Sequence, residues 1–102
     1  MYVIVTASYP NDKVKEVADM YVKAITKYPP DDSLATPVVP VAVRATLQGI
    51  RVIGVHEIKK GKLEVAMARM SNLQTMFYGI QGYRWTMKTY LNLEEAMKTI
   101  GM

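Results

Sequence analysis

A pair of long β-branched segments joined by a tight turn constrains the fold of this chain more than any other feature. The segments VVPVAVRATL, residues 38–47, and IRVIGVHEI, residues 50–58, flank the dipeptide Gln48-Gly49. β-branched residues favour strands, and Gly49 can adopt the positive φ angle of a two-residue hairpin turn. Pro40 lacks a backbone N–H donor, so its strand is predicted to lie at a sheet edge. The chain is therefore expected to contain an antiparallel hairpin.

The segment before the hairpin has the patterns of a strand, a helix and a loop. Residues 2–9, YVIVTASY, are typical of a strand that stops before a proline. Residues 11–28 place apolar side chains three and four positions apart, which indicates an amphipathic helix capped by Asn11 or Asp12. Residues 29–37, with three prolines, are predicted to form a loop.

The segment after the hairpin repeats the helix and strand patterns. Residues 63–79 carry a second apolar helix face, and residues 83–90, YRWTMKTY, are typical of a strand. Asn92 with Glu95 three residues later predicts a capping box that opens a short helix, which Gly101 ends.

The resulting order is strand, helix, strand, strand, helix, strand, with a short C-terminal helix. Helical crossovers on either side of one hairpin predict an α+β, ferredoxin-like βαββαβ fold. Right-handed crossovers place both helices on one face of a four-stranded antiparallel sheet. A chain of 102 residues suits a single domain, residues 1–102.

The predicted hairpin register divides the side chains between two faces. A turn at Gln48-Gly49 places Leu47 opposite Ile50 and Val41 opposite His56. One face is almost entirely apolar and is predicted to lie beneath the helices: Val39, Val41, Val43, Ala45, Leu47, Ile50, Val52, Gly54, His56 and Ile58. The opposite face mixes apolar and charged residues: Ala42, Arg44, Thr46, Arg51, Ile53, Val55 and Glu57. Because this second face is too apolar to remain in water, we expect a homodimer whose two sheets pack face to face.

Composition excludes several classes of site. The chain has no cysteine and one histidine, which excludes disulfides, thiolate metal sites and a cysteine nucleophile. No cluster of acidic residues predicts a metal site, and no metal or cofactor is expected. The net charge is +4, but the lysines are dispersed among acids, so no nucleic-acid partner is expected. The N-terminus MYVIVTASYP lacks the features of a secretion signal, and no stretch approaches twenty apolar residues. We therefore expect a cytoplasmic protein without a membrane partner.

Two segments carry a resemblance to a known superfamily. They are VHEIKKGKLEVAM, residues 55–67, and GYRWTMKTYLNLEEAMKTIGM, residues 82–102. With the element order, they resemble small prokaryotic members of the dimeric α+β barrel superfamily. This superfamily includes cofactor-free antibiotic-biosynthesis monooxygenases, stress-responsive barrel proteins, small polyketide cyclases and effector-binding domains of regulators. The resemblance implies a homodimer with pockets between sheet and helices, and it leaves any higher assembly open.

The candidate site centres on the only histidine. His56 follows Gly54 by two residues, and a glycine within a strand leaves a gap in which a ligand can sit. A histidine beside such a gap suits a general base, with an ordinary pKa near 6.5. The alternative is that His56 only hydrogen-bonds a backbone carbonyl at the strand end.

Aromatic residues and a methionine are expected to complete an apolar pocket: Tyr21, Met70, Phe77, Tyr78, Tyr83 and Trp85. The same residues also suit an ordinary core. One hypothesis is a binding domain for an apolar or aromatic small molecule. The alternative is a cofactor-independent cyclase, isomerase or monooxygenase, with His56 as base and Tyr78 or Tyr83 as orienting donor. A regulator's effector domain is less favoured, because no helix-turn-helix is present. On the dimer face, Arg44 and Arg51 either bind an anion or pair with Glu57 across subunits.

Overall fold

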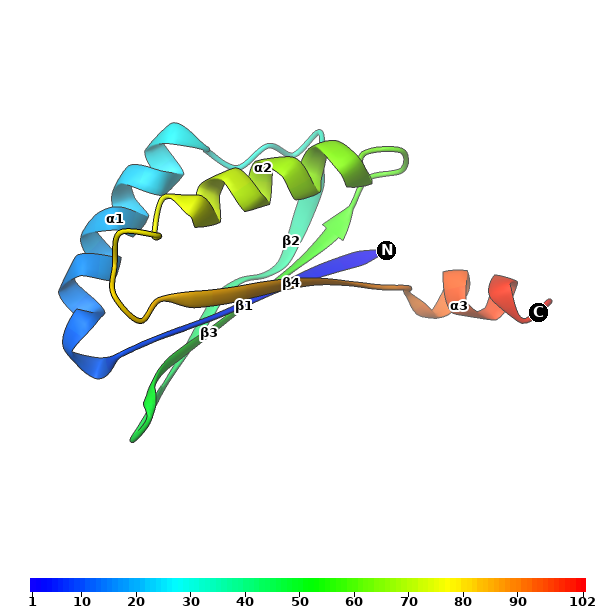
Figure 1. Cartoon of the computed structure of the whole chain (residues 1–102). Helices are drawn as coiled ribbons and strands as arrows, with labels where there is room; N and C mark the ends of the chain where they lie inside the picture. Colours follow the sequence, from blue (N-terminus) through cyan, green and yellow to red (C-terminus); the bar gives the residue numbers. More distant parts are fainter.

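A computed structural model describes residues 1–102 and contains one four-stranded antiparallel sheet (Figure 1). The strands lie in the order β2-β3-β1-β4. Their bounds are Tyr2–Tyr9 for β1, Ala35–Thr46 for β2, Gly49–Ile58 for β3 and Arg84–Tyr90 for β4. The helices are η1 at Asn11–Lys13, α1 at Val14–Lys27, α2 at Leu63–Thr75 and α3 at Leu93–Thr99. This is the predicted α+β, ferredoxin-like fold, with β2 at a sheet edge as Pro40 requires.

The hairpin turn differs from the prediction by one residue. Thr46 pairs with Gly49, so Leu47 and Gln48 form the turn. Leu47 is therefore 95% exposed and does not lie beneath the helices, contrary to the prediction. The Thr46 hydroxyl donates to the Gly49 carbonyl at 2.6 Å and accepts from the Gln48 N–H at 3.2 Å. Gly49 follows the turn with φ +134°, and a Cβ there would lie 2.7 Å from the Tyr9 carbonyl oxygen. The position therefore requires glycine, although Gly49 lies just after the turn and not within it as predicted.

The register along β2 also differs from the prediction. β2 begins at Ala35, inside the segment predicted as a loop, and Pro37 rather than Val41 lies opposite His56. Irregularities occur between Pro37 and Ala42, where β2 contains extra residues. As a result Val39 pairs with Val55 and lies on the face away from the helices, contrary to the prediction.

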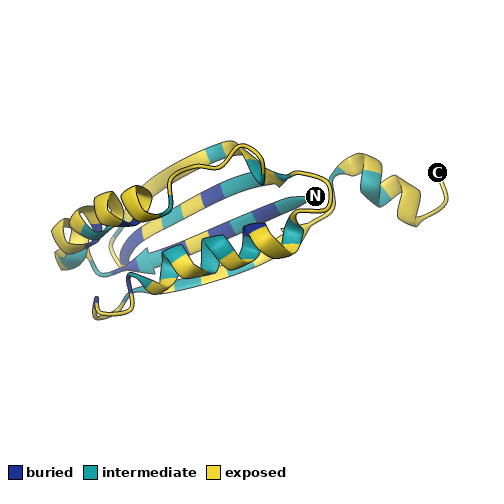
Figure 2. Cartoon of the chain, turned by 90° about the horizontal axis from the view of Figure 1, so that it is seen from above, coloured by how far each residue is buried: buried dark blue, intermediate teal, exposed yellow.

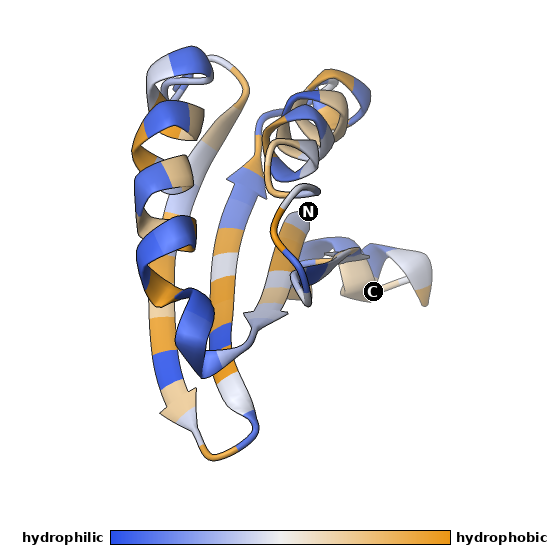
Figure 3. Cartoon of the chain, turned by 60° about the vertical axis from the view of Figure 1, so that its left-hand side comes forward, coloured by the Kyte–Doolittle hydropathy of each residue, from blue (hydrophilic) through white to orange (hydrophobic).

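Both long helices cover the same face of the sheet. The side chains of β1 that point toward them are buried: Val3, Val5, Ala7 and Tyr9. Figure 2 shows buried residues on the strands between α1 and α2, and Figure 3 shows apolar and polar residues alternating along those strands. A core cluster gathers at one end of this layer: Tyr9, Val17, Ala24, Ile50, Phe77 and Ile80.

The helix ends confirm one predicted cap and contradict the other. No side chain caps α1, because Asn11 instead donates a hydrogen bond to the Thr46 carbonyl at 3.2 Å. Asn92 and Glu95 form the predicted capping box at the start of α3. α3 extends away from the sheet, as Figure 1 shows, and therefore leaves the sheet face opposite α1 and α2 uncovered. None of the helices has the length and apolar character needed to cross a membrane.

Candidate functional site

A cavity of about 510 Å³ lies between the sheet and the two long helices. Residues from β1, β2, β3, α1 and α2 line it, and 19 of the 28 lining residues are hydrophobic. Small-molecule sites typically have volumes of about 300–1,000 Å³, a mostly apolar lining and a few polar groups. The cavity has the size and composition of such a site.

The rim of the cavity is formed by apolar side chains that remain partly exposed. On α1, the lining residues Tyr21 and Ile25 are 40% and 38% exposed. On the edge strand β2, the lining residues Val41 and Val43 are 43% and 62% exposed. Exposed lining on these two elements places the opening of the cavity between α1 and β2.

Gly54 lies on the cavity floor, where other groups of the chain come close to its backbone. A Cβ at Gly54 would lie 3.1 Å from the Pro40 carbonyl oxygen and 3.4 Å from His56 Nε2. The absence of a side chain therefore lets the irregular part of β2 and the imidazole lie close to the β3 backbone. The gap predicted at this glycine is thus bordered directly by His56.

His56 lines the cavity and is half-buried. Burial lowers the pKa of its imidazole below the ordinary 6.5, so the ring is neutral at pH 7. A neutral imidazole has one N–H donor and one acceptor nitrogen. The ring forms no hydrogen bond with any other group of the chain, including the backbone carbonyl considered from sequence. Both ring nitrogens are therefore available to a ligand.

Several other polar groups of the lining already have hydrogen-bond partners within the chain. The Arg69 guanidinium donates to the Pro29 carbonyl at 2.5 Å and lies 5.8 Å from the Tyr28 ring centroid. The Tyr83 hydroxyl donates to Gln74 Oε1 at 2.6 Å, and burial raises the pKa of this phenol, so it stays protonated. Asp31 accepts from Ser33, and these hydrogen bonds lower its pKa. The imidazole of His56 has no such partner, and the hydroxyls of Tyr9, Tyr21 and Tyr28, which also line the cavity, have none either.

Stacked aromatic rings form one wall of the site. The Phe77 and Tyr83 rings are 4.7 Å apart and nearly parallel, and Tyr83 stacks on Tyr9 at 6.1 Å. All three residues line the cavity. Flat rings at this end suit a flat apolar ligand.

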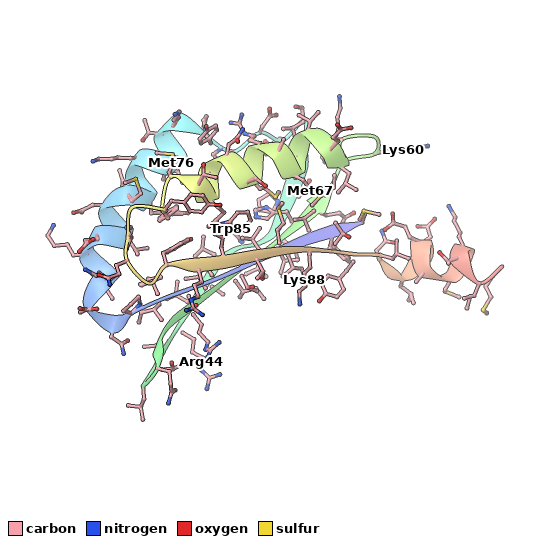
Figure 4. The ribbon with its side chains drawn as sticks, viewed as in Figure 1. Arg44, Lys60, Met67, Met76, Trp85 and Lys88 are labelled. Carbon is pink, nitrogen blue, oxygen red and sulfur yellow. The ribbon has the colours of Figure 1, made fainter.

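The structure brings six of the eight residues predicted for the pocket into one lining: Tyr21, Gly54, His56, Met70, Phe77 and Tyr83. Tyr78 does not line the cavity and is 66% exposed, because its neighbour Phe77 occupies the inward position. Trp85 lies on the helix side of the sheet, opposite Ala7 (Figure 4), but also outside the cavity lining. It is on β4, at the sheet edge away from β2, whereas the strand residues of the lining come from β1, β2 and β3.

Sequence reasoning did not identify the polar end of the lining. Asp31 and Arg69 line the cavity together with Pro29 and Pro30. Arg69 lies between Ala66 and Met70 on α2, beside the apolar helix face. This position in the sequence could have indicated that Arg69 borders the cavity. The segment with Pro29, Pro30 and Asp31 gave no such indication in the sequence. Its path over the sheet depends on the register between β2 and β3.

The six residues predicted to face a second copy lie on the face away from the helices: Arg44, Thr46, Arg51, Ile53, Val55 and Glu57. β1 adds Tyr2, Ile4, Thr6 and Ser8 to this open face, and β4 adds Arg84, Thr86, Lys88 and Tyr90. In Figure 4, Arg44 and Lys88 lie on the side of the sheet opposite α2.

Titration of His56 gives the first prediction. Its imidazole is expected to titrate below pH 6.5 by NMR, because burial disfavours the charged ring. Between the lowered folded pKa and 6.5, the unfolded chain binds a proton that the folded chain does not. The free energy of unfolding should therefore rise with pH through this window and level off above it. In the His56→Ala variant this part of the pH dependence should vanish in urea unfolding, and an unchanged slope would contradict the assignment.

Comparison with known proteins identifies no family for this chain. No family model matches the chain, and no curated protein matches it. A formyltetrahydrofolate deformylase from Pseudomonas putida KT2440 superposes with a TM-score of 0.56 at 9% identity, over 88% of this chain and 29% of that one. A dimeric ferredoxin-like protein from an uncultured marine organism gives 0.47 at 16% identity, over 90% and 94%. The designed protein Foldit4 gives 0.43 at 11% identity, over 89% and 100%.

The similarity to the deformylase, at 9% identity, concerns the fold alone. The chain spans less than a third of the deformylase. The resemblance to monooxygenases and stress-responsive barrel proteins has no family match and stays a prediction.

Proposed function

We propose that this chain binds an apolar or aromatic small molecule in the cavity between the sheet and the helices. The observation that carries the proposal is the cavity of about 510 Å³, which has a mainly hydrophobic lining and includes the unpartnered imidazole of His56. Burial of apolar ligand surface supplies the affinity, and one directed hydrogen bond fixes the orientation.

The placement of the polar groups defines the ligand further. A flat apolar body fits the wall formed by Tyr9, Phe77 and Tyr83. A single donor or acceptor on the ligand meets the neutral imidazole of His56. A neutral imidazole favours an uncharged ligand group at this position.

Binding is favoured over catalysis by the surroundings of the histidine. A general base is normally oriented by a third group that hydrogen-bonds its second nitrogen. His56 has no such partner, and the hydroxyl of Tyr83, one of the two predicted orienting donors, is engaged by Gln74. The second predicted donor, Tyr78, lies outside the cavity. A catalytic role of His56 would therefore need support from a large rate loss in the His56→Ala variant.

The test is a fluorescence titration with N-phenyl-1-naphthylamine, an apolar aromatic probe with one N–H donor. We expect saturable binding at one site per chain. His56→Ala should weaken binding about 2- to 13-fold, the equivalent of 0.5–1.5 kcal/mol for one neutral hydrogen bond. Tyr78→Ala, an aromatic change outside the cavity, should leave the affinity unchanged.

Other outcomes contradict the proposal. Absence of saturable binding, or equal weakening by Tyr78→Ala, would reject the cavity as the binding site. Were a turnover assay found, a loss of roughly 10²–10⁴-fold in rate for His56→Ala would instead support a general base.

We further propose that the chain forms a homodimer through the open face of its sheet. The support is chemical: Ile53 is 39% exposed at the centre of this face, flanked by Ala42, Val55 and Ile4. A small chain also gains stability by burying such a face against a partner. A second copy fits it, because an isologous interface needs only one self-complementary surface.

A further inference from the structure

Three arginines align in one row across the open face. Arg44 on β2 lies directly opposite Arg51 on β3, Arg51 pairs with Ser8 on β1, and Ser8 pairs with Arg84 on β4. Neighbouring strands lie about 4.8 Å apart, so the row spans roughly 14 Å across the sheet. Paired residues point to the same face, so the three guanidinium groups project from one side.

The row borders a hollow of about 460 Å³ on the sheet. Arg44, Arg51, Arg84 and Ser8 are among the residues that line it. The next row toward the sheet centre adds the hydroxyls of Thr6 and Thr86, which hydrogen-bond to each other at 2.6 Å. The hollow therefore combines three cationic groups with three hydroxyls and contains no carboxylate.

The arginines have no counter-charge within the chain. None of them takes part in an ion pair. The one acidic residue on this face, Glu57, pairs with Tyr2 at the other end of β1, about 20 Å from Ser8 at roughly 3.3 Å per residue. Like charges directly opposite each other destabilise a sheet, as for Arg44 and Arg51. An external anion would relieve this repulsion.

We propose that this hollow binds a small molecule that carries two or more phosphate or carboxylate groups. Each guanidinium presents a planar fork of N–H donors that matches such groups in two-point contacts. The length of the row accommodates several anionic groups at once, and the hydroxyls of Ser8 and Thr86 add neutral donors beside them.

A compact anion is favoured over single-stranded nucleic acid. Surfaces that bind single strands place aromatic rings among the basic residues, so that the bases can stack. Here the aromatic pair of the open face, Tyr2 and Tyr90, lies at the end away from the arginine row. The residues next to the row are Ala42, Ile53, Thr6 and Thr86, which give no stacking platform.

The site is complete in one chain; it shares the open face with the proposed dimer interface and does not involve the apolar cavity. The open face of each chain carries one carboxylate, Glu57, against the three guanidiniums of the row. Burying unpaired charges is costly, so a bound polyanion would neutralise the row and favour association.

Calorimetric titration at constant ionic strength tests the proposal with three probes: inorganic phosphate, tripolyphosphate and citrate. We expect one tripolyphosphate or citrate per chain, bound at least tenfold more tightly than phosphate; the tighter of the two identifies phosphate or carboxylate as the preferred group. Arg51→Gln should weaken that binding about 10- to 100-fold, the range for one charge-assisted contact. The arginines are exposed, so the variant should fold, which circular dichroism checks.

A charge-matched control separates a site from net charge. The triple variant Arg44→Gln, Arg51→Gln, Arg84→Gln should abolish binding. The triple variant Lys23→Gln, Lys59→Gln, Lys60→Gln removes the same charge from exposed positions elsewhere and should retain it. Equal losses in both variants, or no preference for tripolyphosphate or citrate over phosphate, would overturn the proposal. Tighter binding of a uridine dodecamer than of tripolyphosphate would overturn it in favour of a nucleic-acid surface.

Discussion

The Ile53→Lys variant is expected to have the mass of one chain, 11.5 kDa, in light scattering, whereas the unmodified protein should have twice that mass. Ile53 lies at the centre of the open face, between Ala42 and Thr6. In the proposed dimer a lysine there would bury a charge without a partner, which costs several kcal/mol. Each 1.4 kcal/mol weakens association tenfold, so the dissociation constant should rise by roughly three orders of magnitude.

Two control variants locate the interface. Val65→Lys places the same charge on the outer side of α2, where Val65 is 55% exposed, and should leave the dimer intact. Ile100→Lys changes the end of the projecting C-terminal segment, where Ile100 is 70% exposed. A monomer for Ile100→Lys together with a dimer for Ile53→Lys would move the interface to that segment. An 11.5 kDa particle for the unmodified protein would reject the dimer.

The two faces of the hairpin could be predicted from sequence despite a wrong register. The observed pairing near the turn is displaced by two residues, so that Val43 lies opposite Val52 rather than Gly54. Side chains alternate with a period of two, and a displacement by two leaves each residue on its expected face. Two residues left the predicted helix-covered face: Val39, beside the irregular part of β2, and Leu47, which lies in the turn. Extra residues in a strand depend on tertiary packing, here on the close approach of Pro40 to Gly54.

The limits of the site prediction have a similar origin. Local pattern identified six lining residues, because an inward position on a helix or strand can be read from periodicity. It could not place Trp85. This residue faces the helices as its alternation along the strand predicts, but β4 lies at the sheet edge opposite β2, outside the cavity. It also missed that Arg84 extends the row begun by Arg44 and Arg51. That alignment passes through β1, and the register between β1 and β4 follows from no local turn.

Filling the cavity at its floor should have the largest effect on ligand binding. Gly54→Leu is expected to weaken N-phenyl-1-naphthylamine binding roughly 5- to 150-fold, since overpacking of an occupied space costs about 1–3 kcal/mol. The new side chain would extend from a Cβ only 3.4 Å from His56 Nε2, in the space proposed for the ligand. Gly79→Leu is the matched control, because its Cβ would meet open space. It should bind the probe as the unmodified protein does.

A second variant approaches the same space from the opposite wall and avoids the tight contact at Gly54. A Cβ at Gly54 lies 3.1 Å from the Pro40 carbonyl, so Gly54→Leu can also perturb the edge strand. Ala66 is buried on α2 and lines the cavity, so Ala66→Phe extends into it from the helix side. Ala68→Phe, on the exposed side of the same helix, is its control. Loss of probe binding in Gly54→Leu and Ala66→Phe, with both controls unaffected, is the expected pattern. Full affinity in a folded Ala66→Phe variant would mean that the probe, and by extension the ligand, does not occupy this cavity.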